Sequence, residues 1–317
     1  MMDAVAAHRK LDSAFLDALE ELAKSPHAGN WWRDVLASDD LFVAVRRNSL
    51  NVYYRGASIF KIDWNGTRIV PSTHAKYLVR QDQTYVPLIE GQFQHSPASL
   101  IWDHYEGPET LRQMMRAATP FAGEEKSGLH PLIMGDPSVI DAEIALTRAA
   151  EEQADTEKPA TAKQDRLDAA VARNTADGPS IVFYEAKHFS NSALRASGDN
   201  APAVIGQMDD YEKALTYYAP SLTAGYVEVA RALVRIDELR KSARNSDTTK
   251  LDPLIAQIAK SGIPPIIDTK PRLLIFGFDK AQRDDPAWRK HLEKLEIRLD
   301  GRVRAIGNPT RQTVAFR

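Results

Sequence analysis

The feature that most constrains this chain is a pair of strand-forming runs joined by a tight turn. Residues 180–187 carry the sequence SIVFYEAK, which is rich in β-branched and aromatic residues, and residues 166–172 form a second run of strand type. Between the two runs lies the turn-forming pair Asp177 and Gly178. The pattern predicts an antiparallel hairpin, and this half of the chain is expected to build a sheet around it.

Two charged residues stand at the end of the second run. Because side chains alternate between the faces of a strand, Glu185 and Lys187 share a face with the apolar Ile181 and Phe183. A face with a purely structural role would have stayed hydrophobic. Asp168 lies on the preceding run, and antiparallel pairing brings it within reach of Glu185. We therefore predict a catalytic centre of two carboxylates and a lysine at one edge of the sheet.

This combination suits the hydrolysis of a phosphodiester bond. Magnesium prefers oxygen ligands and often takes only one or two protein carboxylates, so Asp168 and Glu185 are predicted to bind Mg²⁺, with Mn²⁺ as a substitute. The ion lowers the pKa of a bound water and offsets the charge of the phosphate, while Lys187 orients that water or stabilises the developing negative charge. The competing interpretation is a ladder of surface salt bridges without chemistry.

These residues resemble the PD-(D/E)xK nuclease superfamily, whose core runs helix, three strands, helix, strand. The resemblance rests on Asp168, on the Glu185 and Lys187 pair, and on Glu143 in the helix expected before them. It implies a magnesium-dependent endonuclease in which these four residues are catalytic. It also implies an α/β fold with a restriction-endonuclease-like core, in which helices flank a central mixed sheet. Leu167 departs from the motif, because proline precedes the aspartate in its nominal form.

The resemblance extends to a glutamine and a tyrosine of the Q-x-x-x-Y element found in the RecB-like branch. Gln207 and Tyr211 match it and lie four residues apart on a predicted helix over residues 203–218, so they face the same way. The resemblance implies that Gln207 belongs to the catalytic site and that both residues approach the metal or the nucleic-acid backbone. Asp165 remains a rival to Asp168 as the metal ligand, because the first core strand has no definite position upstream of them.

Residues 1–135 are predicted to form an N-terminal module. The first 36 residues read as helical, and residues 41–70 favour the strands of a small antiparallel meander, with Asn65-Gly66 as a hairpin turn. Residues 71–135 are aromatic-rich but aperiodic, so we assign them to a connecting region.

Residues 136–317 are predicted to form the nuclease-like domain. Its first element is a helix over residues 139–153, which contains Glu143. A helical insertion is expected at about 224–262, and the apolar run at 273–278 is of the buried-strand type.

Composition limits the function classes that remain. The chain has no cysteine, which excludes disulfides, thiolate metal sites and a cysteine nucleophile. Its net charge is −2, but residues 270–317 hold 12 Lys and Arg against 6 Asp and Glu, so this segment is basic. The absence of a Walker phosphate-binding loop and of a G-x-S-x-G run disfavours an ATPase and a serine hydrolase.

DNA is the expected partner and RNA the second choice. The N-terminus lacks a secretory pattern and the chain lacks a long apolar run, so we expect a cytoplasmic protein with no membrane partner. We expect a homodimer, because cutting both strands of a duplex favours two-fold symmetry. A partner protein of a defence or repair system is suggested by architecture alone. The alternative function is a non-catalytic nucleic-acid-binding or protein-interaction module on a nuclease-like scaffold.

Overall fold

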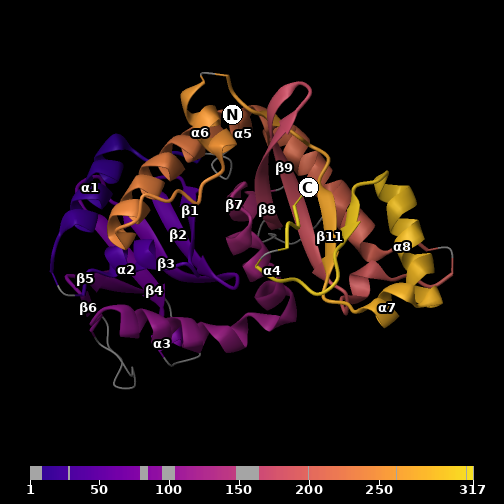
Figure 1. Cartoon of the computed structure of the whole chain (residues 1–317), viewed down its shortest axis with the longest axis horizontal. Helices are drawn as coiled ribbons and strands as arrows, with labels where there is room; N and C mark the ends of the chain where they lie inside the picture. Colours follow the sequence, from indigo (N-terminus) through magenta and orange to yellow (C-terminus); the bar gives the residue numbers. More distant parts are fainter. Residues whose placement is uncertain are drawn as a thin grey trace, which may run out of the picture. The chain divides into compact units, whose positions relative to one another are not determined.

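The chain has a mixed α/β architecture with two multi-stranded sheets (Figure 1). The computed structural model describes residues 9–27, 29–78, 85–94, 104–147, 164–198, 200–261, 263–311 and 313–316. By contacts the chain divides into two compact units. We call Arg9–His130 with Val227–Gly262 the meander unit, and Pro131–Tyr226 with Ile263–Arg317 the hairpin unit.

The sheet of the meander unit is antiparallel, and its strands follow one another in chain order. They are β1 (Phe42–Arg46), β2 (Ser49–Tyr54), β3 (Ala57–Trp64), β4 (Ile69–His74), β5 (Tyr85–Ile89) and β6 (Gln92–Phe93). The predicted meander over residues 41–70 is confirmed. Its turn after β3 is held by Asn65, whose Oδ1 accepts hydrogen bonds from the backbone N–H groups of Thr67 and Arg68 at 3.0 and 2.8 Å.

Helices surround this meander. They are α1 (Ser13–Lys24), α2 (Trp31–Ala37), α3 (Pro108–Ala118) and α4 (Gly123–Gly135), with short 3-10 turns at Ala75–Leu78 and Thr119–Phe121. The predicted apolar face of the first helix is buried, because Phe15 stacks on Trp64 of β3 with ring centroids 5.6 Å apart. Trp31 of α2 packs on Phe60 of the same strand at 5.4 Å. Aromatic contacts therefore form part of the core of this unit.

The helical segment at 227–262 packs with residues 9–130. It contains the second part of α5 (Ala203–Arg244) and α6 (Pro253–Lys260). Arg235 forms ion pairs with Asp17 at 2.8 Å and with Glu20 at 2.5 Å. Arg240 donates to the carbonyl of Leu41 at 3.0 Å, and its burial lowers its pKa to about 10. Charged groups of α5 thus hold the segment in place.

The sheet of the hairpin unit is mixed and has the order β12-β11-β9-β8-β7, with β10 beside β9. Its strands are β7 (Val139–Thr147), β8 (Gln164–Thr175), β9 (Gly178–His188), β10 (Ile266–Ile267), β11 (Arg272–Phe276) and β12 (Val303–Ala305). The first three are antiparallel, whereas β10 and β11 run parallel to β9, and β12 runs parallel to β11. The predicted hairpin is confirmed, with a turn between Thr175 and Gly178. The apolar run at 273–278 supplies most of β11, as predicted.

The prediction of a helix over residues 139–153 is wrong. Residues 139–147 form β7, and residues 148–153 lie outside the described residues. Helix-forming residues such as Ala142 and Leu146 favoured a helix, but pairing with β8 outweighs that weak local preference. The strand that precedes the hairpin, for which the sequence indicated no definite position, is therefore β7.

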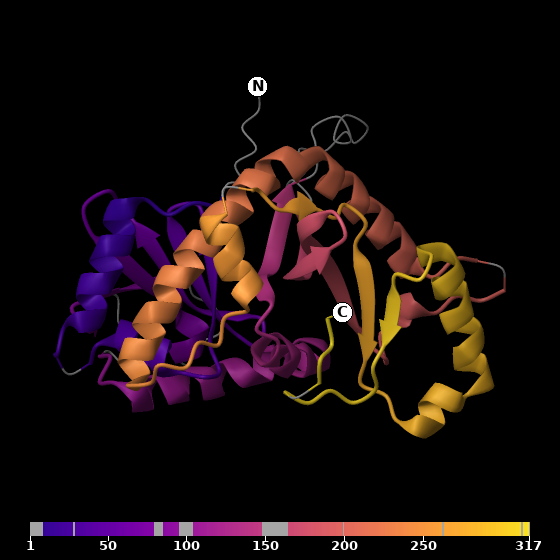
Figure 2. The same cartoon turned by 45° about the horizontal axis from the view of Figure 1, so that its top comes forward.

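Helix α5 covers one face of the hairpin, and the C-terminal segment packs against the other (Figure 2). Phe183 meets Tyr226 of α5 at 5.9 Å, and Tyr184 meets Phe316 at 5.1 Å. The predicted helix over 203–218 is confirmed and extends to Arg244. The remaining helices of this unit are η5 (Ser192–Leu194), α7 (Lys280–Asp284) and α8 (Pro286–Leu299). No helix in the described ranges has the length and hydropathy needed to cross a bilayer.

Acid is expected to destabilise the meander unit through His74 at the end of β4. Burial and the charge of Lys76 lower the pKa of His74, and the backbone N–H of Lys76 donates to its Nδ1 at 3.1 Å, which requires a neutral ring. The unfolded chain therefore binds this proton more readily than the folded one. The stabilisation that the neutral His74 contributes is fully present above 6.5, the ordinary pKa of histidine, and is lost as the pH falls below that value.

The effect is small because the ring is only partly buried. Replacing His74 by Gln should reduce the drop in melting temperature between about pH 7.5 and pH 5.5 by roughly 1 to 2 °C. An unchanged drop in this variant would show that His74 does not sense pH.

Candidate active site

The hairpin register brings Asp168 to Glu185. Ala169 pairs with Tyr184, so the next position on each strand places Asp168 across from Glu185. The Oδ2 atom of Asp168 accepts a hydrogen bond of 2.7 Å from the backbone N–H of Ala186. Asp168 is buried, with 4% of its surface exposed. This bond therefore anchors one carboxylate of the predicted centre to the neighbouring strand.

Glu185 and Lys187 lie on the same face of β9, as the alternation of the strand predicts. The Nζ atom of Lys187 is 2.5 Å from Oε1 of Glu185. The two side chains are 11% and 3% exposed, so the ion pair is buried. Desolvating both charges costs free energy that apolar side chains at these positions would avoid. Such a cost is expected where the charges serve a function.

Gln207 and Tyr211 reach this group from α5. The Nε2 group of Gln207 donates to Oε1 of Glu185 at 2.8 Å and to the hydroxyl of Tyr211 at 2.5 Å. The Tyr211 hydroxyl donates to the carbonyl of Arg166 at 2.9 Å. Their spacing of four residues thus places both side chains on the face of α5 that meets the hairpin. Burial, and next the negative charge of Glu185, raise the pKa of Tyr211 above its usual range.

Glu143 lies near the centre, but on strand β7 and not on the predicted helix. Its neighbours pair as Ala142 with Ala169 and Ile144 with Leu167, so Glu143 stands across from Asp168. Its backbone is left-handed, with a φ of 55°, which is unusual for a residue with a side chain. Its Oε2 atom is 3.6 Å from Nη1 of Arg166. The third carboxylate is therefore turned towards an arginine.

Asp165 lies on the opposite face of β8 from Asp168, because the two positions are an odd number of residues, three, apart along the strand. It pairs with Leu146 of β7. The structure thus brings Asp168 to Glu185 and keeps Asp165 on the other side of the sheet.

Sequence reasoning missed Arg166 as a member of this group. Its carbonyl accepts from Tyr211, and its guanidinium faces Glu143. The alternation that put Glu185 with Lys187 also puts Arg166 with Asp168, and this was the available signal.

Removing the Tyr211 hydroxyl is expected to loosen the site. Tyr211→Phe deletes the bond to the Arg166 carbonyl and a partner of Gln207, so the unfolding free energy should fall by about 1 kcal/mol. Any activity that depends on Glu185 should fall roughly 10-fold. Tyr217→Phe is the matched control, because Tyr217 lies on the same helix and is 58% exposed. Urea denaturation compares the two variants, and equal losses would argue against a role for the Tyr211 hydroxyl.

The oxygen donors of the site are few. In the part of the chain that the structure describes, no group of three or more His, Asp and Glu is placed to hold a metal ion. Asp168 and Glu185 remain as the carboxylates that the hairpin register brings together. No family model, curated protein or solved structure matches the chain, so the chemistry of this site follows from its own residues.

Proposed function

We propose that this chain is a magnesium-dependent nuclease that hydrolyses phosphodiester bonds of DNA. The observation that carries the proposal is the buried group formed by Asp168, Glu185 and Lys187 on paired strands, with Gln207 bonded to Glu185. Two carboxylates can hold a metal ion that activates water for attack on a phosphate, and an amine beside them can offset the charge that develops there. A glycosidase would also use two carboxylates, but it gives the lysine no role.

The order of the elements supports a restriction-endonuclease-like core of the PD-(D/E)xK type. Three antiparallel strands, β7 to β9, are followed by α5 and then by β11, which pairs with β9 in parallel. This agrees with a core in which three strands precede a helix and a further strand. It also puts the Glu185 and Lys187 pair on the central strand of the sheet, held by neighbours on both sides. Such a position favours precise placement of the charges.

The donor set fits magnesium, which takes one or two protein carboxylates and fills its other positions with water and phosphate oxygens. Asp168 and Glu185 would hold it. Once bound, the ion would supply a more acidic water and offset phosphate charge. The bond from Ala186 fixes the Asp168 carboxylate, and Gln207 fixes that of Glu185, so both ligands are oriented by the protein before metal arrives.

Lys187 is the group suited to the reacting phosphate. Its ammonium lies against Glu185 and is mostly buried, where a positive charge acts strongly on a nearby oxyanion. We assign it the role of orienting the attacking water or of stabilising the negative charge that develops on the phosphate. Tyr211 stays protonated at neutral pH, so its role is to position Gln207 and the substrate backbone, not to act as a base.

Cleavage of circular DNA tests the proposal. Purified protein is incubated with supercoiled duplex and circular single-stranded DNA in magnesium or manganese, beside Lys187→Ala. Metal-dependent cutting that this variant lacks is the expected result, and because circles have no ends it would also establish endonucleolytic action. If the wild type neither cuts nor binds metal in calorimetry, the nuclease is excluded, and a non-catalytic binding module on the same scaffold takes its place.

A further inference from the structure

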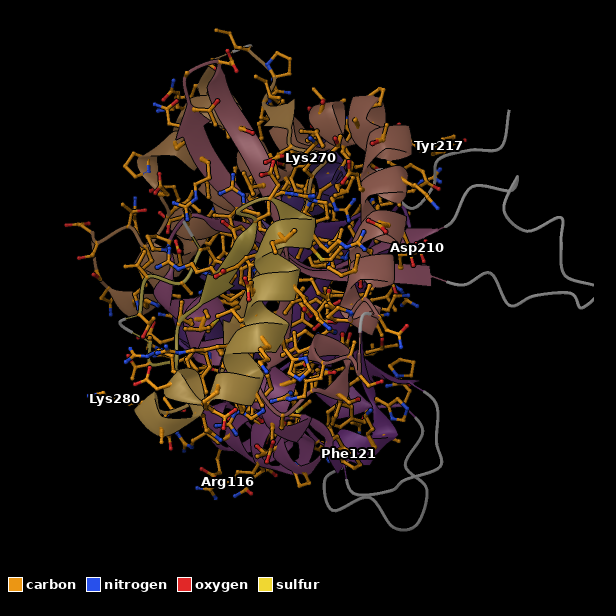
Figure 3. All side chains as sticks on the ribbon, turned by 90° about the vertical axis from the view of Figure 1, so that its right-hand side faces the viewer. Arg116, Phe121, Asp210, Tyr217, Lys270 and Lys280 are labelled. Atoms are coloured by element: carbon orange, nitrogen blue, oxygen red, sulfur yellow. The ribbon has the colours of Figure 1, made fainter. Side chains whose placement is uncertain are left out.

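The exposed surface of α8, which faces the viewer in Figure 3, carries several positive charges. Lys290, Lys294 and Arg298 follow one another at four-residue intervals, so they share one side of the helix. Glu296 lies on the opposite side, because each residue turns by about 100° around the axis, whereas Glu293 lies one turn from Lys290, at the margin of the same side. We call Lys290, Lys294 and Arg298 the cationic stripe.

Two contacts show where the cationic stripe faces. Lys294 donates from Nζ to the carbonyl of Gly198, and the backbone N–H of Ala196 donates to Nδ1 of His291 at 3.4 Å. Both partners belong to the segment that follows the last residue of β9, His188, and leads to α5. The stripe therefore borders the chain segment that exits the candidate active site.

Arg195 adds a fourth positive charge beside the stripe. Its guanidinium lies over the rings of Phe189 and Trp288, 4.6 and 5.1 Å from their centroids, and donates to the Phe189 carbonyl at 2.6 Å. Burial, and then the charges of Arg195 and Lys294, lower the pKa of His291, so these cations act on the same place. Within the described residues, none of the four cations forms an ion pair with a carboxylate. Their charge is left for an external partner.

We propose that the cationic stripe binds the phosphate backbone of a DNA duplex and guides it to the candidate active site. The choice of partner rests on the proposed function. The two ends of the stripe are eight positions apart in the sequence, or about 12 Å along the helix. One strand of B-DNA advances about 3.4 Å per phosphate, so the stripe can face roughly four phosphates. A protein partner is less suited to it, because the centre of a protein interface is poor in charge and rich in aromatic residues.

Duplex binding tests this inference separately from cutting. Fluorescence anisotropy measures the affinity for a labelled duplex of about 25 base pairs, in EDTA, over about 50 to 200 mM salt. Replacing Lys290, Lys294 and Arg298 by Gln should weaken binding roughly 10- to 100-fold at low salt and should reduce the salt slope by about 2 to 3.

The matched control replaces Lys280, Arg283 and Arg289 by Gln. It removes the same charge, but Arg283 and Arg289 are already paired with Asp284, each at 3.1 Å. This variant should keep most of the affinity.

The outcomes separate this inference from the nuclease. If the wild type binds DNA through the stripe but never cuts it, the proposed nuclease function is wrong and the inference on the stripe stands. If the wild type cuts DNA but the stripe substitutions do not change its affinity for the duplex, the inference is wrong and the proposed nuclease function stands. Three other results would also overturn the inference. The stripe and control variants could lose duplex affinity equally, or the stripe variant could lose as much affinity for an acidic polypeptide as for the duplex. The wild type could also fail to bind the duplex at all.

Discussion

Asp168→Asn is expected to lower metal-dependent DNA cleavage by at least about 100-fold, because it removes one of the two charged metal ligands. Asparagine has nearly the same shape, and its amide oxygen can still accept the bond from the Ala186 N–H. The fold should therefore survive. Cleavage of supercoiled DNA at saturating magnesium measures the loss, and calorimetry of the same protein should show weaker metal binding.

Stability separates this functional role from a structural one. Asp168→Asn relieves repulsion from the neighbouring Glu185, so the unfolding free energy should stay within about 1 kcal/mol of the wild type or rise. Asp165→Asn is the matched control, because it changes a buried carboxylate on the opposite face of the same strand. It should leave cleavage nearly intact. A large loss of stability in Asp168→Asn, or equal loss of cleavage in both variants, would contradict the assignment.

Phe183→Ala is expected to cost about 3 to 5 kcal/mol of unfolding free energy, the largest effect on stability that we predict. Phe183 is fully buried at the centre of β9 and packs edge-on against Tyr226. Its removal leaves a cavity between the hairpin and α5 that a close-packed core cannot fill. The melting temperature and the midpoint of urea unfolding measure the effect.

Phe183→Leu is the companion to this variant. It keeps most of the apolar volume and should cost clearly less than the alanine substitution. If the two variants were equally destabilised, the ring contact with Tyr226 would matter more than the cavity. A loss below about 1 kcal/mol for Phe183→Ala would show that the hairpin and α5 are not packed as described.

The parts of the site that could be predicted are those that depend on local periodicity. Alternation along a strand placed Glu185 with Lys187, and a helical interval of four placed Gln207 with Tyr211. The turn at Gly178 then set the register that brings Asp168 across from Glu185. Each of these placements is determined by residues that lie close together in the sequence, so they can be predicted from one sequence.

The parts that could not be predicted depend on contacts between distant segments. Glu143 was assigned to a helix because its neighbours are good helix formers, and only the pairing of β7 with β8 makes it a strand residue. The amphipathic pattern predicts a helix over residues 203–218, whereas α5 continues through Pro220, a residue that interrupts the hydrogen-bond pattern of a helix. It continues because apolar residues beyond the proline, such as Leu222 and Val229, are buried.

The edges of the hairpin-unit sheet bear on how this protein behaves at high concentration. An open edge strand is a template for pairing with another molecule, which leads to aggregation. The outer strand β7 is almost wholly buried, and the opposite outer strand, β12, is three residues long and carries Arg304. Short length and positive charge both discourage a foreign strand from docking there. We therefore expect concentrated solutions of the folded protein to resist growth of intermolecular sheets from this part of the molecule.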